Sequence, residues 1–112
     1  TNKMAKPILY KATAATGALA LDIAPDWDFE LMEVRVHLNA AGGAGDLTVT
    51  LDALAGAEYD AVLFKQDMTA VTDLVYIPAQ PMQFARGDKL AVAWPNAGNK
   101  TYGAEVYVRK VY

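Results

Sequence analysis

Carboxylates are the side chains in this sequence with the greatest capacity for chemistry. The 112 residues include 13 Asp and Glu but a single histidine, His37, and neither serine nor cysteine. Catalysis by a Ser–His or Cys–His pair is therefore excluded, and a metal centre built on histidine would have one imidazole ligand. An enzyme of this composition would have to use carboxylates, Lys, Tyr or Thr.

Three neighbouring aspartates, Asp22, Asp26 and Asp28, could offer oxygens to Ca²⁺. Calcium takes about six to eight oxygen ligands, and no EF-hand loop is present. Aspartate is also favoured in turns, so we assign these residues to turn formation. Other carboxylate pairs could support glycoside hydrolysis, which needs two carboxyl groups about 5–9.5 Å apart. Most acids fall at outward strand positions and in turns, so we expect no enzyme, no metal and no cofactor.

Arg86-Gly87-Asp88 spells a tripeptide used in cell adhesion. Here it is followed directly by residues with strand character, and Gly-Asp by itself turns a chain. We therefore interpret this tripeptide as the turn into a strand at 89–94 rather than as an adhesion motif.

Aromatic and basic side chains on the surface could recognise a sugar or another protein. Trp27 lies between two aspartates in an expected turn, which favours an exposed ring, whereas Trp94 falls on the apolar face of its strand and is expected in the core. Tyr107 and Arg109 fall on the outward face of the last strand, and both residue types are enriched in protein interfaces. His37 also faces outward, as a surface or interfacial imidazole.

Short strands are the elements that must position these residues. Stretches of alternating apolar and polar residues recur, separated by Gly, Pro, Asn and Asp, and no long run has helical spacing. The pattern predicts an all-β fold, an antiparallel β-sandwich of about eight strands with a jelly-roll-like arrangement. The expected strands are 7–13, 18–24, 29–38, 47–53, 59–65, 71–77, 89–94 and 101–111.

Two of these strands depart from simple alternation. Phe29 and Leu31 share one phase, whereas the inward-facing apolar series from Met32 onward has the other. This slip predicts a β-bulge between Leu31 and Met32, or a strand buried on both faces at its start. Residues 61–64 are apolar on both faces, which predicts a central strand or one that lines an interface.

Length and charge limit the domain organisation and the partners. A chain of 112 residues accommodates one domain, which we place at 7–112, after an N-terminal arm at 1–6 that carries Lys3 and Lys6. The arm lacks the apolar core of a signal peptide, and no apolar run reaches the roughly 20 residues that cross a bilayer. The net charge of −3 provides no basic field for nucleic acid, so we expect neither a nucleic-acid nor a membrane partner.

A succession of strand and turn sequences extends from Trp27 to Arg109. They are Asp28-Phe29-Glu30-Leu31, Leu47-Thr48-Val49-Thr50-Leu51-Asp52, Tyr59-Asp60, Asp67-Met68-Thr69, Val71-Thr72-Asp73, Gly87-Asp88-Lys89-Leu90 and Ala93-Trp94-Pro95-Asn96. Together they resemble small structural proteins encoded in the virion gene clusters of tailed bacteriophages. Among these, jelly-roll head-decoration (cement) proteins are similar to this chain in being small, rich in Ala and Gly and free of Cys. The resemblance has no catalytic signature and carries over no functional residue.

The resemblance implies a structural virion protein on the outer capsid surface that binds the phage major capsid protein and stabilises the head. Open sandwich edges must be covered or paired, which symmetric oligomers achieve, so we expect a homo-oligomer, with a trimer favoured over a dimer. A small tail-tip or adaptor subunit and a non-catalytic carbohydrate-binding module, with a glycan as ligand, are the alternatives. The expected interface residues are Lys3, Lys6, Trp27, Tyr107 and Arg109.

Overall fold

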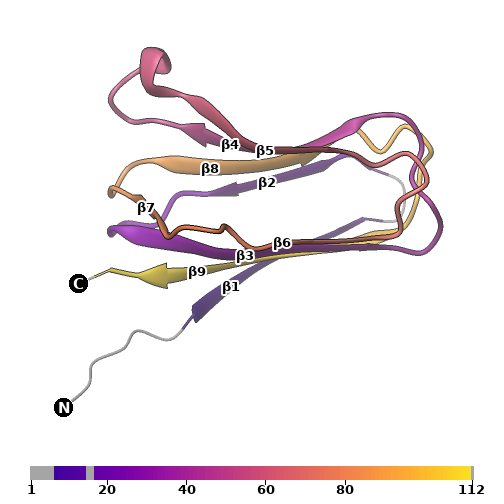
Figure 1. Ribbon diagram of the computed structural model, residues 1–112, viewed down its shortest axis with the longest axis horizontal. Helices are drawn as coiled ribbons and strands as arrows, with labels where there is room; N and C mark the ends of the chain where they lie inside the picture. The colour runs from indigo at the N-terminus through magenta and orange to yellow at the C-terminus, as the bar shows by residue number, and fades with distance from the viewer. Residues whose placement is uncertain (1–6, 15–16, 112) are drawn as a thin grey trace.

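Two antiparallel β-sheets pack face to face in this computed structural model, which describes residues 7–14 and 17–111 (Figure 1). One sheet has the strand order β1-β9-β3-β6, with β7 also paired to β3, and the other has the order β2-β8-β4-β5. The strands are β1 (Pro7–Ala14), β2 (Leu19–Ile23), β3 (Phe29–Leu38), β4 (Asp46–Asp52), β5 (Ala61–Asp67), β6 (Asp73–Tyr76), β7 (Met82–Phe84), β8 (Lys89–Trp94) and β9 (Tyr102–Lys110).

The prediction of an all-β antiparallel sandwich is confirmed, and each expected strand is found. The short strand β7 was not expected, because Pro81 and its neighbours indicate a crossing segment. The only helical element in the described ranges is the 3₁₀-helix η1 (Ala57–Tyr59), and no helix among them is long and apolar enough to span a membrane.

A continuous hydrophobic core fills the space between the sheets. In β8, Leu90, Val92 and Trp94 are buried, while the intervening alanines are half-buried on the outer face. Successive side chains in a strand point to opposite faces, so a regular strand such as β8 contributes every second residue to the core. Burying a Val, Leu or Phe side chain contributes about 1.5–3 kcal/mol, which makes this alternation the main source of stability.

The bulge expected in β3 is present. The register of β3 on β9 shifts between Leu31 and Glu33, so Met32 is the extra residue. Leu31 and Val34 are both buried, whereas Met32 is half-buried. The expectation that Met32 faces the core is therefore wrong: the bulge absorbs the change of phase, and the inward series resumes at Val34.

Residues 61–64 belong to an edge strand, β5, and not to a central one. A register shift on β4 sets Phe64 opposite Val49 but Val62 opposite Thr50. Phe64 consequently packs against the core and stacks on Tyr76 of β6 with ring centroids 4.2 Å apart, while Val62 is 61% exposed. The expected central position is wrong because the two-sided apolarity reflects a bulge. The alternative of an interface-lining strand stays a prediction.

A buried asparagine ties together the loops at one end of the sandwich. Asn96 is 2% exposed, and its amide nitrogen donates to the carbonyls of Gly17 and Lys100, both at 2.9 Å. Its side-chain oxygen accepts the Lys100 N–H at 2.8 Å. The loop at residues 95–101 is thereby fixed to Gly17, which lies just before β2.

Replacing Asn96 by Ala is expected to destabilise the domain by about 2–4 kcal/mol, because buried backbone groups lose their partners. Asn99→Ala is the matched control, since Asn99 has a φ of 53° against 52° for Asn96 but is exposed. The difference between the two free energies of unfolding, measured in urea, isolates the side-chain hydrogen bonds. Equal losses would contradict this assignment.

Gly42 lies where a loop touches the backbone that follows β5. A Cβ at this position would be 2.4 Å from the Met68 carbonyl oxygen, while a Cβ at Gly103 would meet nothing within 4 Å. We expect Gly42→Ala to cost about 1–3 kcal/mol through overpacking and Gly103→Ala to change stability by less than about 0.5 kcal/mol. Thermal and urea unfolding of both variants would test this, and similar effects at the two positions would refute it.

Candidate functional site

The outer face of the β1-β9-β3-β6 sheet carries charged side chains ordered by strand register. We call it the β3 face and define it by Glu30, Met32, Glu33, Arg35 and His37 of β3, Asp73 and Val75 of β6, and Glu105, Tyr107 and Arg109 of β9. Because β3 and β9 are antiparallel, Glu30 stands opposite Arg109, and Arg35 stands opposite Glu105. Opposite charges therefore face each other across these two strands, an arrangement that stabilises a sheet.

Arg109 forms the best-shielded ion pair of this face. Its guanidinium donates to a Glu30 carboxylate oxygen at 2.6 Å, and the side chains of Arg109 and Glu30 are only 30% and 16% exposed. A charge-assisted bond with this degree of shielding is stronger than a fully exposed surface pair. Arg109, expected at an interface, is thus held in a fixed orientation on the outer face.

Tyr107, the neighbouring residue expected at an interface, is half-buried beneath Arg35. The Arg35 guanidinium carbon lies 5.0 Å from the centre of the Tyr107 ring, within the range of a cation–π contact. Arg35 Nε also donates to the Glu33 carboxylate, and this bond raises the pKa of Arg35 above its usual value. Arg35 therefore remains charged while covering an aromatic ring.

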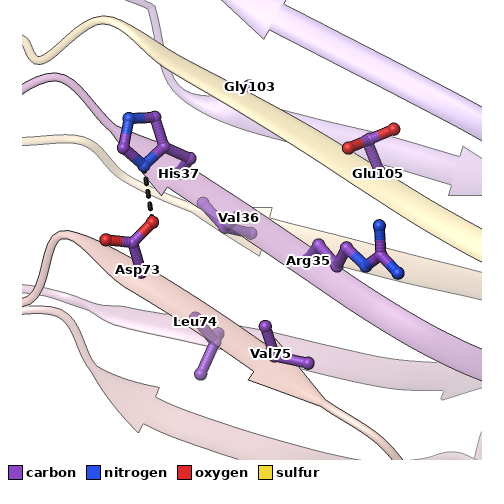
Figure 2. Close-up of a pocket in the computed structure, with 8 residues that line it drawn as sticks. All are labelled: Arg35, Val36, His37, Asp73, Leu74, Val75, Gly103 and Glu105. Carbon is purple, nitrogen blue, oxygen red and sulfur yellow. Dashed lines mark hydrogen bonds and ion pairs between the residues drawn. The ribbon is translucent and has the colours of Figure 1, made fainter.

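His37 and Asp73 form a third pair, at the end of β3 nearest the loops that Asn96 holds. The His37 Nδ1 and Asp73 Oδ1 atoms are 2.5 Å apart (Figure 2). The imidazole, followed by the Thr72 hydroxyl at 3.1 Å, lowers the pKa of Asp73. Gly103 stands opposite His37 in the register and adds no side chain, so space remains beside the imidazole.

Three adjoining hollows follow β3 across this face, and we call them together the β3 groove. The first, about 270 Å³, lies between the bulge at Met32 and the segment 77–81 that joins β6 to β7. The second, about 200 Å³, adjoins Glu33 and Tyr107 and shares Met32 with the first. The third, about 170 Å³, lies beside His37 and Asp73 and shares Arg35 with the second.

The number of charged side chains that line the groove increases from its first hollow to its third. Its first hollow is lined by apolar side chains together with Glu30, and Ile77 there is 62% exposed. Its third hollow combines the charged groups of Arg35, Asp73 and Glu105 with an apolar lining that includes Leu74 and Val75 (Figure 2). Such a surface can hold a chain segment that has both an apolar and a charged side chain.

The aromatic and basic residues expected elsewhere do not join this site. Trp27 is half-buried and packs edge-on against Phe29, with centroids 6.4 Å apart, so the expected exposed ring is not found. Trp94 is buried, as expected. Lys3 and Lys6 lie outside the described residues.

The aspartates considered for calcium are engaged in local contacts. Asp26 pairs with Arg86 at 3.3 Å, and Asp28 accepts the Arg86 N–H at 2.8 Å. Asp22 lies 4.0 Å from Lys89. Across residues 7–14 and 17–111, no group of three or more His, Asp or Glu side chains is placed to hold a metal ion.

The Arg86-Gly87-Asp88 tripeptide forms a turn. Asp88 accepts the backbone N–H groups of Leu54 and Ala85 at 3.0 and 3.1 Å, and Gly87 has a φ of 94°. With its carboxylate used in this way, Asp88 fastens the segment after β4 to the turn before β8. The interpretation as a turn agrees with this geometry.

Glu30, Asp73 and the segment 77–81 were not anticipated as parts of a site. Their roles depend on pairings between residues far apart in the sequence, such as Glu30 with Arg109. The outward alternation of Glu33, Arg35 and His37 is the sequence signal in β3 that indicates a charged outer face. A known register would have been needed to identify the partners.

Comparison with known proteins supplies no further assignment. The sequence matches no protein-family model, and a search of curated proteins gives no match.

Removing the His37 imidazole is expected to raise the pKa of Asp73 toward its ordinary value of about 3.9, and removing the Thr72 hydroxyl should raise it less. Because the folded pKa lies below the unfolded one, these bonds stabilise the fold above about pH 4, and the stabilisation is lost as pH falls through the folded pKa. Carboxyl ¹³C NMR titrations of His37→Ala and Thr72→Ala would measure both shifts. An unchanged Asp73 pKa in His37→Ala would contradict the assigned cause.

Proposed function

We propose that this protein is a non-catalytic structural subunit that acts by binding other proteins, and that the β3 face is its binding surface. The observation that carries this proposal is the combination of matched charges with exposed apolar groups on one sheet face. Val75 and Ile77 are 60% and 62% exposed; Val75 lines the third hollow of the β3 groove, and Ile77 lines the first hollow together with Met32.

The matched charges reduce the cost of covering this face. An unpaired charge that is removed from water carries a penalty of several kcal/mol, whereas a paired charge with satisfied hydrogen bonds carries much less. Glu30 and Glu33 already have guanidinium partners, Arg109 and Arg35. A partner can therefore exclude water from this part of the face without leaving the carboxylate of Glu30 or Glu33 unpaired.

The residue types also favour a protein partner. Tyr, Met and Arg are enriched in the cores of protein interfaces, and all three occur on the β3 face. Ion pairs hold the arginines in place, so less conformational entropy is lost on binding than with free side chains. A stiff two-sheet block is suited to such contacts.

The resemblance to phage head-decoration proteins supports a specific setting for this activity. In that setting the chain binds the phage major capsid protein on the outer capsid surface, as a homo-oligomer with a trimer favoured over a dimer. A tail-tip or adaptor subunit would use the same kind of surface at another place in the virion. Locating the subunit in an electron-microscopy map distinguishes the head from the tail.

The carbohydrate-binding alternative depends on an exposed aromatic platform, for which Trp27 was the leading candidate. Trp27 is half-buried against Phe29, so it does not present an open ring. We therefore retain protein binding as the proposed function.

The Val75→Lys substitution is expected to weaken association at least tenfold without changing the melting temperature, because Val75 is exposed on the β3 face. Val62→Lys is the matched control, since Val62 is 61% exposed but lies on the other sheet. Sedimentation velocity and co-sedimentation with phage heads that lack a decoration subunit would measure the effect. A native protein that stays monomeric and never sediments with heads would refute the proposal, as would equal effects of the two variants.

A further inference from the structure

We infer that the β3 groove binds residues 1–6 of a second copy of this chain, so that neighbouring subunits are joined by an exchanged arm. This inference rests on the proposed function and supplies an occupant for its binding surface. The arm has the sequence Thr1-Asn2-Lys3-Met4-Ala5-Lys6.

Residues 1–6 are long enough to follow most of the groove. The groove follows β3 from Glu30 to His37, a stretch of about 23 Å at about 3.3 Å per residue. Residues 1–6 span about 20 Å when fully extended. One arm can therefore contact both the apolar and the charged hollows.

The charges of the groove and the arm are opposite in sign. The β3 face has four carboxylates, on Glu30, Glu33, Asp73 and Glu105, against two guanidinium groups, on Arg35 and Arg109. Summed over the ten residues of β3, β6 and β9 that define this face, the net charge is therefore −2 when His37 is neutral.

Asp73 contributes most directly to this negative charge. Among the described residues, its hydrogen-bond donors are the His37 imidazole and the Thr72 hydroxyl, both of which are neutral when His37 is uncharged. Lys11 of β1 stands opposite Glu105 in the register. The lysines of the arm, Lys3 and Lys6, supply the complementary positive charge.

The apolar hollow suits the residue between the lysines. Met32, Ile77, Pro78 and Pro81 line this hollow at the bulge of β3. Methionine has a flexible, unbranched side chain that fills irregular apolar spaces, so Met4 is the residue of the arm that this hollow would take.

The sheet register places the start of the arm near the groove. Pro7, the first residue of β1, stands opposite Arg109, which in turn stands opposite Glu30. Exchange of arms between two copies is reciprocal under two-fold symmetry, and exchange around a three-fold axis closes a ring. Both arrangements agree with the expected homo-oligomer.

The first test uses a synthetic peptide of residues 1–7 and the domain that lacks residues 1–6. We expect saturable binding, with NMR shifts confined to residues 30–37 and 73–81 and an affinity that falls as salt is raised. We also expect the full chain to associate at least tenfold more tightly than the truncated domain. Absence of peptide binding would overturn the inference.

Charge reversal gives a sharper test within the full chain. Lys3→Glu combined with Lys6→Glu should abolish association, and adding Asp73→Lys should restore part of it. Asp22→Lys, an equivalent reversal on the other sheet, should restore none. Restoration by both or by neither would contradict arm binding at the β3 groove.

The outcomes separate this inference from the proposed function. If the truncated domain associates as well as the full chain while Val75→Lys still disrupts association, arm exchange is wrong and protein binding by the β3 face remains. If the peptide binds but the full chain stays monomeric at all concentrations, the arm folds onto its own groove and exchange is wrong. If the truncated domain unfolds, as judged by circular dichroism, the arm belongs to the sheet, which also overturns the inference.

Discussion

The bulge at Met32 allows β3 to supply side chains both to the hydrophobic core and to the β3 face. If β3 were a regular strand in which Met32 was paired like its neighbours, Phe29 and Leu31 would face the opposite side of the sheet from Val34. The bulge keeps all three in one core, and it pushes a methionine toward the surface beside the gap between β6 and β7. The packing of Phe29, Leu31 and Val34 in the core thus places Met32 in the lining of the apolar hollow outside the core.

Cross-strand pairing organises the charges of the same strand. A carboxylate or guanidinium on an outer sheet face ordinarily points into water and contributes little. Here the antiparallel register aligns Glu30 with Arg109, and Arg35 lies over Tyr107, so the side chains are constrained before any partner arrives. The β3 face is therefore a preorganised surface, and preorganisation reduces the entropy that binding must overcome.

The sequence predicted most of the fold but only part of the site. Alternation of apolar and polar residues is a local property, so the strands and the slip at Leu31 could be located from it. Pairing of distant residues is not local, so the His37–Asp73 contact and the edge position of β5 could not be derived. Trp27 was misjudged because flanking aspartates favour exposure, whereas contact with Phe29 favours burial.

The irregular edge strand β5 has a consequence for how many copies can assemble. A regular, flat edge would accept another strand by backbone pairing, and repeated addition would polymerise the protein without limit. The register shift opposite Val49 and Thr50 distorts this edge, and Lys65 would bring a charge to any added strand. Growth by sheet extension at this edge is disfavoured, so an assembly of the proposed kind would use side-chain surfaces here, which can close on themselves and stop at a finite size.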